Sequence, residues 1–342
     1  GTEGATIDSN LIARNHITTF EARGAGLYCT AAANWTITIT RNRFLGNVAT
    51  SEADFVDGKA QGGGIFIDGQ GVVIGGSAGN GNVFRDNRAQ TGADLYAKNT
   101  YGAIINAEWN SFHVYPATPH YVSALASFDL ANGTGDLAPI TQDVYVAPTG
   151  NDANAGTSSS TPLKTVQFAL ARLLPTTDQP LTIHVGDGVY APDGNGDAFP
   201  LVMTPYVSLR GNGPGRSVLD ARGSGGVILL EGANNVTISG LTIRGGQCGA
   251  GGGVSFRSAM ACSLMNNVIS GNGAFLGGGI YCAARSNPVI AGNLITGNQT
   301  RDTRYFARLG GGMFANDGAR PILIHNVIAS NSALDAGGGV VC

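Results

Sequence analysis

The residues best suited to bind a ligand lie in three polar segments, 16–23, 48–61 and 299–309. Their arginine, aromatic and carboxylate side chains together suit recognition of a sugar, or a lateral contact between assembled proteins. A group of solvated loops is the alternative interpretation. The candidate contact residues are His16, Glu21, Arg23, Glu52, Asp54, Asp57, Arg301, Asp302, Arg304, Tyr305 and Arg308.

Asp193, Asn195 and Asp197 alternate in the sequence DGNGD, as oxygen ligands do in a calcium-binding loop. The twelfth position counted from Asp193 is Thr204, where an EF-hand loop has a glutamate. The segment therefore predicts either a calcium site or a hydrated turn, and calcium is the one candidate cofactor. Hydrolysis of a glycosidic bond would need paired carboxylates on neighbouring strands. The apolar, asparagine-rich strand segments hold no such cluster, so no catalytic residue is assigned.

The charge balance narrows the classes of partner. Charged residues make up 13% of the 342 residues, the formal net charge is -3, and only three residues are lysines. Such a chain has no basic patch to neutralise phosphates, which argues against nucleic acid and anionic membranes as partners. No uninterrupted apolar run reaches the length of a membrane span, so no membrane insertion is expected. Five cysteines are too few and too widely spaced for a disulfide scaffold or a CxxC zinc site.

A repeat determines the expected fold. The pattern Asn-x-(Ile/Phe)-x-x-Asn occurs six times, and a triplet of small residues followed by an apolar residue precedes each occurrence. Each unit contains short segments rich in Val, Ile and Leu, which can bury their apolar faces only by stacking. Equivalent asparagines would then form ladders along a parallel β-helix, with amides bonded from coil to coil. The ladder residues are Asn10, Asn15, Asn42, Asn47, Asn82, Asn87, Asn267, Asn272, Asn293, Asn298, Asn326 and Asn331.

One segment lacks this repeat and predicts a cap. Residues 143–147 predict a strand, and Thr161-Pro162 predicts the N-cap and first turn of a helix. Leucine and valine residues then recur at helical spacing. A short amphipathic helix over 162–174 is therefore expected to cover an open end of the coil.

Residues 143–170, which read DVYVAPTGNDANAGTSSSTPLKTVQFAL, resemble the amino-terminal opening of secreted right-handed β-helix proteins of the pectate-lyase-like superfamily. The segments VSLRGNGPGRSVLDARG and NNVTISGLTIRGG continue the likeness, which extends over the chain at the level of fold. The resemblance implies an all-β, right-handed, single-stranded parallel β-helix and a place outside the cell or on its surface. Related enzymes cleave acidic polysaccharides with stacked or paired carboxylates, but no residue here matches their catalytic sets.

The family's opening is displaced to the middle of this chain. Residues 143–342, with the capping helix, are expected to form the amino-terminal half of the β-helix, and residues 1–130 its carboxy-terminal half, joined by a polar linker over 131–142. About nine coils would give a stack roughly 45 Å long, and the linker reaches about 40 Å only when fully extended. Three arrangements remain open: a circular permutant, a frame cut from a tandem array, or two molecules that complete each other.

The segments GGGVVC, which ends at Cys342, and GAGLYC, which ends at Cys29, occupy the same place in the repeat. We therefore expect Gly1, Cys29, Val341 and Cys342 at a junction between coils, with the two cysteines within the range of a disulfide. The expected function is an extracellular structural subunit that stacks on itself head to tail into a filament or sheath, with adhesive lateral loops. The alternative is a carbohydrate-binding or polysaccharide-cleaving β-helix protein.

Overall fold

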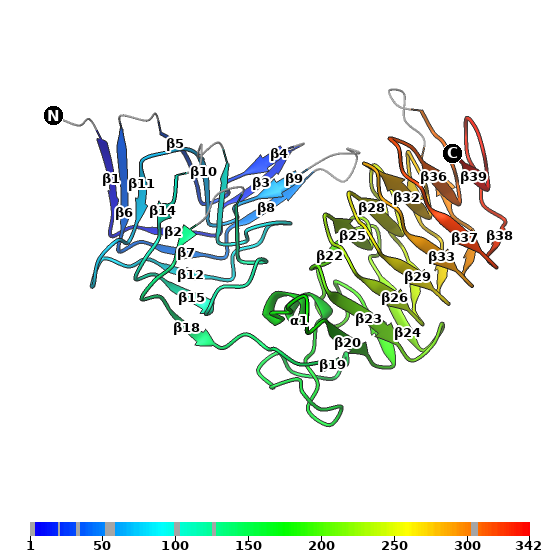
Figure 1. Cartoon of the computed structure of the whole chain (residues 1–342), viewed down its shortest axis with the longest axis horizontal. Helices are drawn as coiled ribbons and strands as arrows, with labels where there is room; N and C mark the ends of the chain where they lie inside the picture. Colours follow the sequence, from blue (N-terminus) through cyan, green and yellow to red (C-terminus); the bar gives the residue numbers. More distant parts are fainter. Residues whose placement is uncertain are drawn as a thin grey trace. The chain divides into compact units, whose positions relative to one another are not determined.

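The computed structural model describes residues 4–19, 21–31, 35–51, 59–98, 103–124, 128–301 and 307–342. The chain forms two compact units, unit 1 up to Pro139 and unit 2 from Ile140 onward, and each is a coil of short strands (Figure 1). Neighbouring strands within each sheet are parallel, as for Val144 beside Ile183. This all-β parallel solenoid confirms the fold expected from the repeat.

Unit 2 contains three long parallel sheets, which we name 2a, 2b and 2c. Sheet 2a consists of β19 (Val144–Val146), β20 (Leu181–Val185), β23 (Val207–Gly211), β26 (Thr237–Ser239), β29 (Ser263–Met265), β33 (Val289–Ala291) and β37 (Ile322–Ile324). Sheet 2b consists of β21 (Gly188–Tyr190), β24 (Ser217–Asp220), β27 (Thr242–Arg244), β30 (Val268–Ser270), β34 (Leu294–Thr296) and β38 (Val327–Ala329). Sheet 2c consists of β22 (Leu201–Val202), β25 (Ile228–Glu231), β28 (Val254–Arg257), β32 (Ile280–Ala283), β36 (Met313–Ala315) and β39 (Val340–Val341). A smaller pair joins β31 (Gly273–Ala274) and β35 (Gln299–Thr300).

Unit 1 repeats this plan in sheets 1a, 1b and 1c. Sheet 1a consists of β1 (Gly4–Asp8), β6 (Thr36–Thr40), β11 (Val72–Ile74), β14 (Ile105–Asn106) and β17 (Phe128–Asp129). Sheet 1b consists of β2 (Leu11–Ala13), β7 (Arg43–Leu45), β12 (Val83–Arg85), β15 (Ser111–Val114) and β18 (Thr134–Leu137). Sheet 1c consists of β5 (Leu27–Ala31), β10 (Ile65–Gly69), β13 (Leu95–Lys98) and β16 (Val122–Ala124). Two smaller pairs join β3 (His16–Thr19) with β8 (Val48–Ser51) and β4 (Glu21–Arg23) with β9 (Lys59–Gln61).

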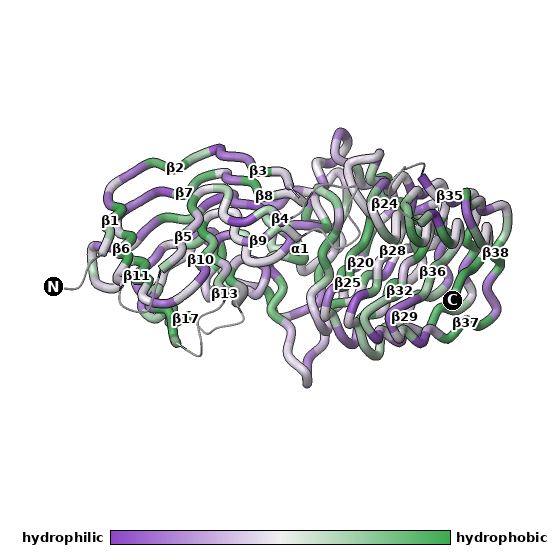
Figure 2. Tube along the Cα trace, turned by 90° about the horizontal axis from the view of Figure 1, so that it is seen from above, coloured by the Kyte–Doolittle hydropathy of each residue, from purple (hydrophilic) through white to green (hydrophobic). Residues whose placement is uncertain are grey.

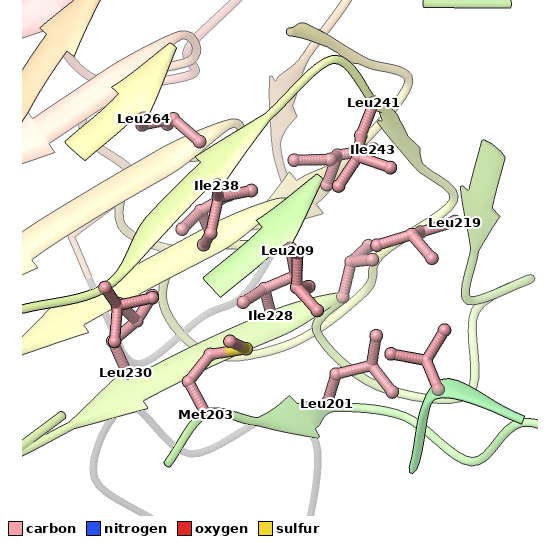
Figure 3. Packing of buried hydrophobic residues seen from close by; sticks show 14 of the residues in the cluster. Leu201, Met203, Leu209, Leu219, Ile228, Leu230, Ile238, Leu241, Ile243 and Leu264 are labelled. Carbon is pink, nitrogen blue, oxygen red and sulfur yellow. The ribbon is translucent and has the colours of Figure 1, made fainter. Parts of the chain in front are cut away.

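Alternation of side chains along each strand produces the core of each coil. In β20, Leu181, Ile183 and Val185 are buried, and the residues between them are only half-buried. Equivalent residues stack in register, as Ile183 does beside Leu209 of β23. Short hydrophobic stretches therefore alternate with hydrophilic ones along each coil (Figure 2). Aliphatic side chains from successive coils fill the interior of unit 2 (Figure 3).

The single helix among the described residues, α1 (Val166–Arg172), is shorter than the helix predicted over 162–174. The N-cap is Thr165, not Thr161, and its hydroxyl accepts the backbone N–H of Phe168 at 3.2 Å. The preceding residues stay extended because Leu163 forms a bridge with Val146 of β19. Buried side chains of α1 join the core of unit 2, as expected for a cap. None of the described segments is a helix long and apolar enough to cross a membrane.

The segment predicted as a linker, 131–142, contains the boundary between the two units, at Pro139 and Ile140, and part of it also belongs to a sheet. β18 occupies Thr134–Leu137 and pairs with β15, which places Thr134 beside Ser111. Ile140 already belongs to unit 2, where it forms a bridge with Leu173. A polar segment can extend a sheet because the unpaired backbone groups of an edge strand bind any extended chain. The longest sheets contain five strands in unit 1 and seven in unit 2, and each coil contributes one strand to a sheet. The chain therefore has more coils than the roughly nine expected from the sequence.

The glycine triplets allow coils to approach where a side chain would not fit. A Cβ on Gly279 would lie 2.6 Å from the carbonyl oxygen of Gly312 and 3.0 Å from Nδ2 of Asn298. Gly279→Ala is therefore expected to lower the free energy of unfolding by about 2 kcal/mol, through overpacking. Denaturant titration measures the loss, and Gly194→Ala, whose Cβ would have ordinary contacts, is the matched control. Equal stability of the two variants would contradict the steric explanation.

Candidate functional site

Two asparagine ladders run along unit 2, at successive corners of the coil. They contain Asn267, Asn293 and Asn326 in one and Asn272, Asn298 and Asn331 in the other. At each step, the backbone N–H and the side-chain Nδ2 of one asparagine donate to Oδ1 of the asparagine in the next coil, as Asn293 does to Asn326 at 3.0 Å. Nδ2 also donates to a carbonyl of the preceding coil, for Asn293 that of Leu264 at 2.8 Å. All these amides therefore point the same way along the coil.

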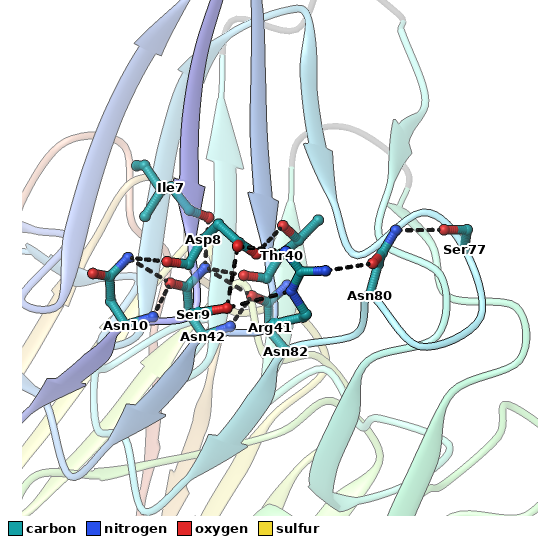
Figure 4. Close-up of polar contacts among 10 residues, drawn as sticks. All are labelled: Ile7, Asp8, Ser9, Asn10, Thr40, Arg41, Asn42, Ser77, Asn80 and Asn82. Atoms are coloured by element: carbon teal, nitrogen blue, oxygen red, sulfur yellow. Dashed lines mark hydrogen bonds and ion pairs between the residues drawn. The ribbon is translucent and has the colours of Figure 1, made fainter.

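Unit 1 contains two ladders with the same construction and polarity. One runs through Asn10, Asn42, Asn82 and Asn110, and the other through Asn15, Asn47, Asn87 and Asp94. Figure 4 shows the start of the first, where Asn10 donates to Asn42 at 3.0 Å. Beside it, Asp8 accepts hydrogen bonds from Arg41 and Thr40, and the bond from Arg41 is the main cause that lowers the pKa of Asp8 to about 2. These contacts join the first two coils of unit 1 on their outer surface.

Two rungs of unit 1 lie outside the repeated pattern. Asn110 begins the pattern with Asn-x-Phe, but Tyr115 stands where the second asparagine would be, so the sequence signal was only half present. Asp94 occupies the place that Gly64 has in the preceding coil. Its carboxylate accepts the side-chain N–H of Asn87 at 2.9 Å, as an asparagine of the next coil would. Nothing in the local sequence indicates this role of Asp94.

Asp94 is a buried carboxyl group with an incomplete set of partners. The residue is 1% exposed, and no described group forms a hydrogen bond with its Oδ2. Burial raises the pKa of Asp94 from 3.8 to about 7, despite the opposing hydrogen bond from Asn87. The ionisation of Asp94 near neutral pH is therefore coupled to the stability of unit 1.

A rung in the middle of a ladder should contribute more to stability than a terminal rung. Asn298 is fully buried, and its removal leaves the backbone N–H and one Nδ2 hydrogen of Asn272 without their acceptor, and takes the side-chain donor from the Ile269 carbonyl. Asn298→Ala is expected to lower the free energy of unfolding by about 3 kcal/mol, because several buried polar groups lose their partners. Asn331→Ala, at a partly exposed terminal rung, should cost about 1 kcal/mol. Denaturant titrations that gave equal losses would show that position along the ladder has no effect.

The predicted contact residues are only partly described. Those within the described residues are His16, Glu21, Arg23, Arg301 and Arg308, whereas Glu52, Asp54, Asp57, Asp302, Arg304 and Tyr305 lie outside them. The described members in unit 1 lie on β3 and β4, directly after the second ladder asparagine of their coil. His16 forms a hydrogen bond with Thr50 at 2.9 Å, and Arg23 pairs with Glu21. This surface carries both charges and hydroxyl groups.

Arg301 and Arg308 belong to unit 2, after the corresponding ladder asparagine. Arg308 pairs with Asp335 of the next coil at 2.7 Å. The Arg301 guanidinium lies over the ring of Phe275, 5.6 Å from its centre. Both side chains are therefore held against the coil.

The three residues with calcium-loop spacing are engaged in other contacts. Asp197 is fully buried and accepts two backbone N–H groups at the start of α1, at 3.1 and 2.9 Å. Asn195 donates to Asp197 at 2.8 Å, and the exposed Asp193 pairs with Arg222. Capping of α1 by Asp197 explains why these polar residues occur here. Calcium binding stays a prediction, and none of these contacts requires it. In the part of the chain that the structure covers, no three His, Cys, Asp or Glu side chains form a group able to hold a metal ion.

The second half of the chain matches a known family. Residues 186–342, from the beginning of sheet 2b to β39, match the family model described as right handed beta helix region. These residues form a right-handed β-helix region. No curated protein and no solved structure matches the chain. The β-helix of unit 2 is thus supported both by its strand pairing and by the match of this segment to the family model.

The last coil of unit 2 and the first coil of unit 1 have inward-facing residues that are left partly uncovered. In the last coil of the unit 2 β-helix, Leu323 is 39% exposed, whereas Ile290, beside it in register, is fully buried. In the first coil of unit 1, Ile7 is half-buried, whereas its register partner Ile39 is fully buried. Core positions at both coils therefore present apolar surface with no further coil over it among the described residues.

The predicted junction residues lie at these two coils, except Gly1, which is outside the described residues. Val341 is in β39 beside Phe314, and the exposed Cys342 follows it. Cys29 is buried in β5, the edge strand of sheet 1c, and burial raises the pKa of its thiol to about 12. Cys29, Cys262, Cys282 and Cys342 carry free thiols.

Proposed function

We propose that this protein is an extracellular structural subunit that stacks on itself head to tail into a filament or sheath. The observation that carries the proposal is the pair of uncovered coils, one in each unit, with inward-facing apolar residues and unpaired strand edges. Removing apolar surface from water is favourable, and an open strand edge is a template for a further strand. Contact between the two coils would remove the apolar side chains from water and would also pair the open strand edges.

The two open coils are built alike. In unit 2 the open coil consists of β37, β38 and β39, and in unit 1 of β1, β2 and β5, each at the edge of its sheet. Large apolar side chains are also exposed on these edge strands, among them Ile322, Ile324 and Val327 in unit 2 and Leu11 in unit 1. Exposed large apolar side chains that gather on one part of a protein are typical of an interface.

Contact between the two open coils is heterologous, because they are different surfaces of the chain. A heterologous contact adds copies in a line and does not close after two copies unless a rotation forms a ring. The contact surfaces on β3 and β4 in unit 1, and around Arg308 in unit 2, would then recur along the filament. Repeated surfaces of this kind suit bundling or adhesion through many weak contacts.

The extracellular location has a separate basis from the stacking. It rests on the resemblance of residues 143–170 to secreted proteins of the pectate-lyase-like superfamily. The match of residues 186–342 to a β-helix family is compatible with that resemblance, but it is less specific. The stacking rests on the open coils. Each part of the proposal can therefore fail without the other.

Light scattering coupled to size-exclusion chromatography, with negative-stain electron microscopy, tests the stacking on the whole chain. We expect elongated particles whose mass increases with protein concentration, both with and without reductant. A single species of 34.8 kDa at every concentration would overturn the proposal.

Binding or cleavage of carbohydrate is the second candidate function, and exposed arginines on unit 1 favour it. Arg14, Arg43 and Arg88 are exposed, and no ion pair joins them to another described residue. Arginine binds carboxylate groups through two parallel hydrogen bonds, which suits an acidic polysaccharide. A panel of acidic and neutral polysaccharides tests this function. Absence of both turnover and any change in melting temperature would exclude it.

A further inference from the structure

We propose that residues 118–124, which end in β16, form a flap that is closed while Asp94 is protonated and opens when Asp94 ionises. This inference does not rest on the proposed stacking. β16 is one edge strand of sheet 1c, whereas β5, which belongs to the open coil of unit 1, is the other. The flap therefore gives unit 1 a conformational change that a proton controls.

Backbone hydrogen bonds hold the flap against the segment that contains Asp94. The Ala93 N–H donates to the carbonyl of His120 at 2.9 Å. The N–H groups of Asp94 and Leu95 donate to the carbonyl of Tyr121 at 2.9 and 3.1 Å. β16 then continues beside β13, its one partner among the described strands of sheet 1c. The flap can therefore separate without disturbing the pairing of β13 with β10.

The neighbouring coil decides whether water reaches a ladder rung. Asn298 lies next to the coil of Asn331 and is fully buried. Asn331, with no further coil over it among the described residues, is only half-buried. Asp94 is 1% exposed with the flap in place, as a covered rung is. Opening of the flap therefore gives Asp94 the hydration of an uncovered rung.

The carboxyl group of Asp94 fits the closed flap only while it is neutral. Its Oδ1 accepts from Asn87 at 2.9 Å, and no described group forms a hydrogen bond with its buried Oδ2. Burial of a neutral acid costs less hydration free energy than burial of a carboxylate that has a single donor. Water hydrates both oxygens in the open state. Ionisation therefore favours the open state.

The other charged and titratable groups near Asp94 do not replace this hydration. Arg85, at the end of β12, and Asp86, directly after it, act on the pKa of Asp94 in opposite directions. The glycine triplet that begins β10 lies on the side away from the flap and has no side chains. The flap itself contributes His120 and Tyr121. Loss of hydration lowers the pKa of His120 to about 4, so this side chain is neutral above pH 5.

The flap is expected to open as pH rises. Asp94 has a pKa of about 7 when buried and an ordinary value of 3.8 when hydrated. The equilibrium constant for opening therefore increases about fiftyfold between pH 5 and pH 7 and changes little above pH 8. Opening frees one edge of β13, and an unpaired strand edge is a template for a further strand.

Hydrogen exchange of the whole chain, measured by mass spectrometry at pH 5, 7 and 8, tests the flap. The reporters are the N–H groups of Ala93, Asp94 and Leu95, whose acceptors lie in the flap. Their protection factor, which is the intrinsic exchange rate divided by the measured rate, removes the direct effect of hydroxide on exchange. We expect this factor to fall about fiftyfold from pH 5 to pH 7 in the wild type and to stay constant in Asp94→Asn. Asp86→Asn, which changes the neighbouring exposed carboxylate, should behave as the wild type does.

The outcomes separate a local opening from unfolding of unit 1. A protection factor that is constant in the wild type, or that falls equally in Asp94→Asn, would overturn the flap. An equal fall at Val83 and Arg88, whose N–H groups donate to the carbonyls of Asn42 and Asn47, would also overturn it, because unit 1 would then open as a whole. A fall at the reporters with constant protection at Val83 and Arg88 would support it. None of these results depends on stacking, which light scattering measures separately.

Discussion

Leu323→Asp is expected to convert the stacked particles into single folded chains. Leu323 is 39% exposed at the open coil of unit 2, so an aspartate there stays hydrated in the single chain. In the joint the same carboxylate would be buried inside the coil without a partner. A penalty of about 4 kcal/mol lowers the association constant about a thousandfold. Analytical ultracentrifugation over a range of concentrations measures this change directly.

Leu294→Asp is the matched control for this variant. Leu294 is 37% exposed on β34 of the preceding coil, on the outward face of sheet 2b. The same change of side chain there should leave stacking unaltered. The Leu323→Asp chain still has the open coil of unit 1. When this variant is added to wild-type particles, it should therefore cap one end of each particle and shorten it. Equal effects of the two variants, or particles that are insensitive to Leu323→Asp, would refute the coil-to-coil contact.

Asp94→Asn is expected to stabilise the chain at neutral and alkaline pH and to have little effect near pH 4. The pKa of Asp94 is raised from 3.8 to about 7 by burial, so the unfolded chain releases this proton at a lower pH than the folded chain does. The free energy of unfolding of the wild type therefore falls as pH rises from about 4 to about 7, and is constant above that range. The complete effect is on the order of 4 kcal/mol. Asparagine carries no charge at any of these pH values, and its Oδ1 can still accept from Asn87.

Thermal unfolding at several pH values measures this difference in unit 1. Asp129→Asn is the control, because Asp129 is exposed and its carboxylate accepts the Ala131 N–H, which an amide oxygen can also accept. The melting temperatures of Asp94→Asn and the wild type should agree near pH 4 and diverge as pH rises. Parallel curves at every pH, or the same divergence in Asp129→Asn, would contradict the assignment of the titration to Asp94.

Prediction from the sequence succeeded for contacts between equivalent residues of successive coils. Two asparagines five residues apart recur in each unit, and a coil that repeats must place each one beside its equivalent in the next coil. The ladder from Asn293 to Asn326 follows from that spacing alone. The parallel β-helix fold follows for the same reason, since the repeated apolar segments have no other way to bury their faces.

Local patterns failed where a distant partner decides the conformation. The helix starts after Thr165 and not at Thr161, because Leu163 is held in an extended bridge to Val146. The polar segment 134–137 forms β18 because an edge of sheet 1b is available to it. Hydrophobic periodicity and helix caps describe only the segment itself, so neither could reveal these contacts.

The sequence by itself determined the coil, its ladders and the glycine corners, because these repeat from one unit to the next. Only the tertiary structure decided the roles of the residues that depart from the repeat. Asp94 completes a ladder in place of an asparagine, Asp197 accepts the N–H groups that begin α1, and Leu323 is left uncovered. In each case the role depends on what the neighbouring coil lacks or supplies, and a repeat pattern carries no information about its own exceptions.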